Sequence, residues 1–253
     1  MSVILGGNTG ISLGSVSPAS IVTSNLVLNL DAAKSASYPG TGTTWYDISG
    51  SSNNATLING TTYSSSNSGV MTLNGTSNWI QVPNNVLFQN NTNMSLSIWV
   101  NFSSIPVNTI SFINQGPQDI AYNRNYFWLQ YTNGGTPSTQ KLWWEGGSGT
   151  SGSDLFQLTY NWVPSINTWY NITTTFEPNL AKIYLNGYLV ASTTTTVNFI
   201  GANNLLYPFS IGSYRGNIDY FFNGELNLPL FYKKTLSATE VLQNYNTVKD
   251  RYI

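Results

Sequence analysis

The stretch WYNITTTFEPNLAKIYLNGYLV, residues 169–190, decides the fold of this chain. From Tyr170 to Phe176, bulky side chains alternate with polar ones, which is the period of a β-strand with one buried face. Pro178 and Asn179 then interrupt the pattern, because proline has no N–H for a ladder and asparagine tolerates turn geometry. The pattern predicts a strand that ends in a tight turn.

The dipeptide Asn186-Gly187 lies between two apolar runs, residues 183–185 and 188–190. Asn-Gly in this setting is typical of a β-hairpin, because a type I′ turn needs positive φ at both central residues. Residues 169–190 are therefore predicted to form three consecutive antiparallel strands.

Short strands are also predicted along the rest of the chain. Residues 94–102, MSLSIWVNF, alternate in the same way, and we expect this strand to be central in its sheet. A second hairpin is expected at Asn74-Gly75, between Leu73 and residues 79–82. Further strands are predicted at residues 26–31, 109–113, 125–131, 141–145 and 154–160. Turn signals at short spacing between them are typical of an all-β sandwich.

One short helix is predicted near the C-terminus, over residues 238–249. Ser237 and Glu240 have the spacing of a capping box, in which each side chain accepts a backbone N–H of the other residue. Apolar residues follow at helical spacing, namely Val241, Leu242, Tyr245 and Val248. This stripe should pack on the sandwich.

The composition excludes several classes of function. Among 253 residues, 14% are aromatic and only 8% are charged, with a net charge of −1, so no basic surface for nucleic acid is expected. The chain has no Cys, which excludes disulfides and thiolate chemistry, and no His, the commonest general base. We find no secretory signal at the start and no run of about 20 apolar residues, so no membrane partner is expected.

Four stretches, in the same order as here, resemble laminin-G-like domains of the concanavalin A-like lectin/glucanase superfamily. They are the loop at residues 47–54, the strand at 94–102, the hairpin at 169–190 and the closing stretch at 209–245. The resemblance implies a jelly-roll sandwich of two antiparallel sheets with one short C-terminal helix. We expect this domain to span residues 25–253, after an N-terminal leader or anchoring arm at residues 1–24.

The resemblance also implies a candidate calcium site. Related domains often hold Ca²⁺ between an Asp of the early loop and an Asp near the end, and Asp47 matches the first, with Asn53 and Asn54 as neutral ligands. Asn227 stands where the second acid is expected, and lost ligand charge lowers calcium affinity. The alternative for Asp47 is a side-chain bond to the backbone across Ser49. We expect no cofactor other than this weak calcium site.

We expect no enzymatic activity. Glycoside hydrolysis needs two carboxylates across the scissile bond, and glucanases of this fold carry clustered acids on one strand. The acids of this chain are well separated in sequence, and Glu145 is the best single candidate.

Aromatic residues are dense in the middle third of the chain, and their rings can stack on sugars or fill the core. The candidates for glycan binding are Tyr126, Trp128, Trp143, Trp144 and Trp162. Because adjacent strand residues face opposite sides, one of Trp143 and Trp144 should be exposed or lie under a loop.

The leader carries Val, Ile and Leu among Gly and Ser, and it is either flexible or an arm that joins a neighbouring subunit or another virion protein. Residues 236–252 and 38–47 resemble lectin-type domains of tailed phages, especially those that infect cyanobacteria. This resemblance implies a virion structural protein on the particle exterior, in a fibre, tail or capsid decoration, that can bind host glycans. The alternative is a free-standing lectin or adhesin outside the cell or at its surface.

Overall fold

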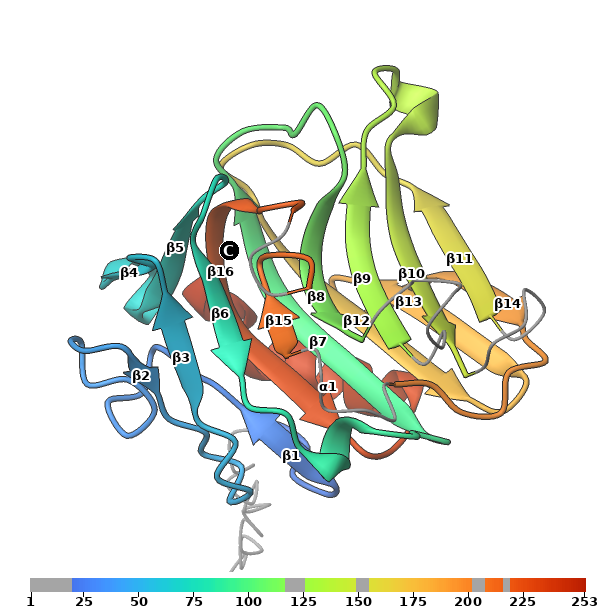
Figure 1. Ribbon diagram of the computed structural model, residues 1–253, viewed down its shortest axis with the longest axis horizontal. Coiled ribbons are helices and arrows are strands. Elements are labelled where there is room, and N and C mark those ends of the chain that lie inside the picture. The colour runs from blue at the N-terminus through green and yellow to red at the C-terminus, as the bar shows by residue number, and fades with distance from the viewer. Residues whose placement is uncertain (1–19, 117–125, 149–154, 202–207, 216–218) are drawn as a thin grey trace, which may run out of the picture.

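The computed structural model describes residues 20–116, 126–148, 155–201, 208–215 and 219–253. Within them the chain forms two antiparallel sheets that stack face to face (Figure 1). A single α-helix of the described part packs on the outer face of one sheet. The predicted all-β sandwich with a short C-terminal helix is confirmed. No helix among these residues is long and apolar enough to cross a membrane.

The strand order within each sheet follows from the backbone pairing. Sheet A runs β14 (Tyr188–Thr194), β13 (Leu180–Leu185), β12 (Trp169–Glu177), β7 (Met94–Phe102), β16 (Asn223–Tyr232), β5 (Val70–Asn74) and β4 (Thr62–Ser64), and β1 (Leu26–Asn29) also pairs with β16. Sheet B runs β11 (Leu155–Asn161), β10 (Lys141–Gly147), β9 (Tyr126–Thr132), β8 (Ile110–Gln115), β15 (Phe209–Ile211), β6 (Trp79–Val82), β3 (Ala55–Ile58) and β2 (Thr44–Trp45). The helices are α1 (Ala238–Val248) and the 3₁₀ turns η1 (Ser66–Ser68), η2 (Val86–Phe88), η3 (Pro137–Thr139) and η4 (Lys249–Arg251).

Residues 169–190 form the three predicted strands. Asn186 and Gly187 have φ of 51° and 83°, as the predicted turn requires, and Leu185 pairs with Tyr188. The expectation of one buried face is wrong for β12, because Thr173 on its other face is also buried. The Thr173 hydroxyl donates to Ser97 Oγ on β7 at 2.9 Å, so this face of sheet A is an internal surface.

Helix α1 and the chain around it cover that face of sheet A. The predicted capping box is present: Ser237 Oγ accepts the N–H of Glu240 at 3.2 Å, and Glu240 Oε2 accepts the N–H of Ser237 at 2.9 Å. Trp99, on the central strand β7, stacks on Tyr245 of α1 and on Tyr252, with ring centroids 5.6 and 4.3 Å away. The outer face of sheet A therefore has its own aromatic core.

The predicted hairpin at Asn74-Gly75 is wrong. Strand β5 lies in sheet A and β6 lies in sheet B, so the turn between them carries the chain across the sandwich. Asn74 Oδ1 accepts the N–H groups of Thr76, Ser77 and Asn78, which widens the turn beyond a two-residue hairpin. Asn74-Gly75 and Asn186-Gly187 carry the same local signal, but only the second forms a hairpin.

Residues 20–24, which the sequence assigns to the leader, contact the domain. Val22 is buried, its N–H donates to Asn244 Oδ1 at 2.8 Å, and its C=O accepts the Tyr232 hydroxyl at 3.0 Å. Gln243 donates to the C=O of Ser20 at 2.7 Å. The rest of the expected arm, residues 1–19, lies outside the described residues.

These contacts predict different effects for two truncations. A chain that begins at Ser20 should unfold at the temperature of the full chain, whereas a chain that begins at Leu26 loses the burial of Val22 and the hydrogen bonds made by Ser20, Val22 and Asn25. We expect a loss of about 3 kcal/mol and a melting temperature about 6–12 °C lower, measured by calorimetry. Equal melting temperatures for the two truncations would show that residues 20–25 contribute nothing to the domain.

Candidate functional site

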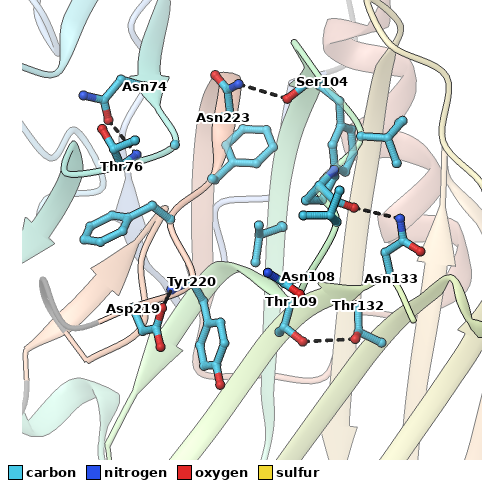
Figure 2. Close-up of a pocket in the computed structure, with 18 residues that line it drawn as sticks. Asn74, Thr76, Ser104, Asn108, Thr109, Thr132, Asn133, Asp219, Tyr220 and Asn223 are labelled. Atoms are coloured by element: carbon cyan, nitrogen blue, oxygen red, sulfur yellow. Dashed lines mark hydrogen bonds between the residues drawn. The ribbon is translucent and has the colours of Figure 1, made fainter. Parts of the chain in front are cut away.

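A cleft of about 780 Å³ opens at one end of the sandwich, shown in Figure 2. It lies where the β5–β6, β7–β8 and β9–β10 connections meet the segment before β16 (Figure 1). Antiparallel neighbours alternate in direction, so these connections all leave their sheets at the same end. The volume is within the usual range of ligand pockets, about 300–1,000 Å³.

The floor of the cleft is apolar and belongs to the core. It is formed by Phe102, Ile110 and Phe222, which are buried, and Phe102 and Phe222 meet edge to face with centroids 5.4 Å apart. Val107 stands at the lip with 79% of its surface exposed. Because the floor residues are buried, a ligand in the cleft would meet apolar surface mainly at Val107 and at the half-buried Phe221.

The walls are polar and, with one exception, uncharged. The polar side chains among the described lining residues are Asn74, Thr76, Ser104, Asn108, Thr109, Thr132, Asn133, Asp219, Tyr220 and Asn223. Hydrogen bonds tie different connections together, because Asn223 donates to Ser104 Oγ at 3.0 Å and Asn133 donates to the C=O of Pro106 at 2.7 Å (Figure 2). These cross-links hold the walls in place without a ligand.

The pair Asp219 and Tyr220 forms a fixed part of the wall. The C=O of Asp219 accepts the N–H of Tyr214 at 2.9 Å, and the C=O of Tyr220 accepts the N–H of Ser111 at 2.8 Å. Asp219 Oδ1 accepts the N–H of Tyr220 at 2.9 Å, and Tyr220 has a φ of 57°. The Tyr220 ring packs on Trp128, with centroids 5.6 Å apart.

The structure places the five predicted aromatic candidates differently from one another. The Trp128 ring packs against the Tyr220 ring, and Trp128 Nε1 donates to Ser111 Oγ at 3.0 Å. Tyr126 is fully buried, and Trp143 is half-buried on the same outer face of sheet B. Trp144 lies in the core, as the strand period requires for the neighbour of Trp143.

Trp162 is also a core residue, and its ring meets Phe102 edge to face at 5.8 Å. Burial leaves Trp144 and Trp162 no exposed ring face for a sugar, and none of the five candidates is among the described residues that line the cleft. Sequence reasoning missed Asp219, Tyr220 and the wall asparagines. The available signal was that several Asn-containing connections leave neighbouring strands at one end.

The candidate calcium residues form a hydrogen-bonded loop instead. Asp47 Oδ1 accepts the N–H groups of Asn29 and Ser49, both at 2.9 Å, and Oδ2 accepts the Ser49 hydroxyl at 2.9 Å and the N–H of Asn53 at 3.0 Å. The side-chain oxygen of Asn54 accepts the N–H of Asp47 at 2.9 Å. Protein donors thus occupy the oxygens that a calcium ion would need, which is the alternative considered for Asp47.

Asn53 and Asn227 are also committed to protein partners. Asn53 Oδ1 accepts from Asn85 Nδ2 at 2.7 Å, and Asn227 Oδ1 accepts the N–H of Ala32 at 2.9 Å. The described residues contain no group of three or more Asp, Glu, His or Cys that could hold a metal ion. The residues present do not fit the calcium site that the resemblance implies.

Glu145 lies on the outer face of sheet B and is fully buried. Its two carboxylate oxygens accept from Gln130 Nε2 at 3.3 Å and from Gln157 Nε2 at 3.1 Å. Glu145 is not among the residues that line the cleft.

The sequence pattern of the concanavalin A-like lectin/glucanases superfamily matches residues 74–242, more than half of the chain. The chain belongs to this superfamily. Its fold is therefore a lectin-like, carbohydrate-binding fold, found in both enzymes and binding domains. No curated protein sequence matches the chain.

Solved structures agree with this assignment. Domain 4 of AbnA, a GH43 extracellular arabinanase from Geobacillus stearothermophilus in complex with arabinotriose, is 18% identical, with a TM-score of 0.64 over 88% of this chain and 98% of that one. The binding domain of Paraclostridial Mosquitocidal Protein 1 is 18% identical, with a TM-score of 0.66 over 88% and 52%.

The ligand-binding domain of botulinum neurotoxin serotype D, in complex with N-acetylneuraminic acid, is 17% identical, with a TM-score of 0.67 over 89% of this chain and 51% of that one. The chain thus spans about half the length of the two toxin domains. At these identities the similarity establishes the fold.

The hydrogen bonds of Asp47 predict a stability effect that does not depend on calcium. In Asp47→Asn, the amide nitrogen cannot accept, so two donors lose their partner at a cost of about 2 kcal/mol. We expect the same loss in excess calcium and in excess chelator, measured by urea unfolding. A wild-type chain that is markedly less stable in chelator would show that a bound cation shares this loop.

Proposed function

We propose that this chain is a non-catalytic glycan-binding module and that the cleft at the end of the sandwich is its sugar site. The observation that carries the proposal is the lining of the cleft, in which amide and hydroxyl groups lie beside the partly exposed apolar side chains of Val107 and Phe221. A sugar ring presents hydroxyls around its edge and C–H groups on its faces, so it matches both kinds of surface.

The state of the cleft without a ligand also favours binding. The bonds from Asn223 to Ser104 and from Asn133 to Pro106 fix the walls before a sugar arrives, which lowers the entropy cost of binding. Asn108 is exposed at the cleft and has no hydrogen-bond partner among the described residues, so its amide is available to a ligand. Two relatives of the same fold have been solved with arabinotriose and with N-acetylneuraminic acid.

The proposal of a binding module rather than a hydrolase rests on the carboxylates. Asp219 is the one carboxylate among the described residues that line the cleft, and glycoside hydrolysis needs two that flank the bond. Glu145, the best candidate from the sequence, has its oxygens bonded to two glutamines on another surface.

We further propose that the module is displayed on the exterior of a tailed-phage particle, where binding of host glycans would serve attachment. The resemblance of residues 236–252 and 38–47 to lectin-type phage domains supports this role. Residues 1–19 would then join the domain to another virion protein or to a second copy of the chain. The alternative is a lectin or adhesin outside the cell or at its surface.

Binding at the cleft predicts a specific effect of Asn108→Ala. This change should weaken glycan affinity about five- to tenfold, the value of one hydrogen bond, without a change in melting temperature. Asn161→Ala, on the edge strand β11, is the matched control and should bind as the wild type does. A glycan array followed by calorimetry measures both. Sugar release during these experiments would contradict the non-catalytic role.

The virion role predicts where the chain is found. The full chain should sediment with particles in a density gradient of infected-cell lysate, and a chain without residues 2–19 should stay at the top of the gradient although its domain remains folded. Sedimentation of both forms would exclude residues 1–19 as the attachment, and the absence of both from particles would favour the free lectin.

A further inference from the structure

The charges around the cleft are few and of one sign. Asp219 is the single charged side chain among the described residues that line it, and none of them is Lys or Arg. Residues 216–218, which precede Asp219 in the sequence, are Gly, Asn and Ile and add no charge. A ligand in the cleft therefore meets one negative charge and no positive one from these residues.

The carboxylate of Asp219 is held in place through one of its two oxygens. Its backbone is fixed through the N–H of Tyr214, and Oδ1 is used by the N–H of Tyr220. Oδ2 has no hydrogen-bond partner among the described residues, and Asp219 is exposed. Figure 2 shows Asp219 and Asn133 on opposite sides of the cleft. One fixed carboxylate oxygen can thus accept a hydroxyl of a ligand that lies between them.

Arg215, the closest cation in sequence, lies over an aromatic ring. Its guanidinium lies over the Tyr214 ring, 4.9 Å from the centroid, and its backbone N–H donates to Asn114 Oδ1 at 3.2 Å. Arg215 is absent from the residues that line the cleft. An acidic sugar placed there would meet Asp219 without a counter-charge from the described lining.

We infer that the cleft selects uncharged glycans and discriminates against glycans that carry carboxylate or sulfate groups, with Asp219 as the residue that sets this specificity. The inference rests on the proposed function. A sugar hydroxyl donates to the Asp219 carboxylate in a charge-assisted hydrogen bond, which is stronger than one to a neutral acceptor. The Asp219 carboxylate repels an anionic sugar instead, and two like charges a few Å apart at a protein surface weaken binding by roughly tenfold or more.

This specificity differs from that of one structural relative. The serotype D neurotoxin domain was solved with N-acetylneuraminic acid, which is an anion. The shared fold does not determine the charge of the ligand, because specificity in this cleft depends on connections that lie outside the paired strands.

The test compares matched glycan pairs. An array carries neutral oligosaccharides beside the same backbones with sialic acid, uronic acid or sulfate, and calorimetry then measures the best neutral ligand and its acidic counterpart. At 50 mM NaCl the wild type should bind the neutral member about tenfold or more tightly. At 500 mM NaCl the ratio should shrink, because salt screens exposed charges.

Three variants test whether Asp219 sets the ratio of neutral-glycan to acidic-glycan affinity. Asp219→Asn keeps an acceptor oxygen and should reduce the ratio to less than about threefold, and Asp219→Lys should reverse the preference. Asp250→Asn, which removes an exposed carboxylate from η4, is the charge-matched control and should keep the wild-type ratio. Melting temperatures of all variants confirm that they are folded.

The outcomes separate the two proposals. Equal or tighter binding of the acidic member by the wild type overturns the inference and leaves the glycan-binding function standing. A preference for neutral glycans that survives in Asp219→Asn shows that another residue sets the specificity, which also overturns it. Failure of the wild type to bind any glycan on the array overturns the inference together with the proposed function.

Discussion

The pairing of β7 with β16 is the interaction on which the rest of the structure depends. The register joins Phe102 to Gly224 at one end and Ser95 to Tyr232 at the other, with a bulge at Leu228. The two strands are more than 100 residues apart in the sequence, so the sheet cannot be completed until nearly the whole chain is in place. The same pairing brings the segment before β16, with Asp219 and Tyr220, to the end of the sandwich where β7 leaves its sheet.

Polar side chains on the outer face of sheet A join the C-terminal residues to the sheet. Asn227 on β16 donates to the C=O of Gly69 at 2.8 Å and to the Tyr252 hydroxyl at 2.9 Å, and Tyr252 stacks on Trp99. Burial raises the pKa of the Tyr252 hydroxyl well above its usual value, so it remains a neutral donor and acceptor. Next to it, Arg251 donates from one nitrogen to both oxygens of Asp31, at 2.9 and 3.0 Å. Asn227, which stands where the resemblance implies a calcium-binding acid, thus joins the C-terminal residue Tyr252 to the sheet.

Local signals in the sequence were sufficient for the strands and for the helix, and they failed where the answer depends on distant partners. Asn186-Gly187 forms a hairpin because its flanking strands pair with each other, whereas Asn74-Gly75 links strands whose partners lie elsewhere, in different sheets. Strand alternation correctly separated Trp143 from Trp144, but it could not show which face was core. The cleft residues escaped prediction because they come from four separate connections, and only the closed sandwich brings them together.

The docking of Val22 has a mechanical consequence. A force applied to residues 1–19 would be transmitted to the domain through Ser20 and Val22. Their hydrogen-bond partners are Gln243 and Asn244 on α1 and Tyr232 at the end of β16. None of these residues lines the cleft, so the load path and the ligand site are separate. The next strand along the chain is β1, which pairs with β16, and β16 in turn pairs with the central strand β7, so tension would pass from β1 to this strand pair. A chain tethered by its first residues could therefore hold a ligand under load.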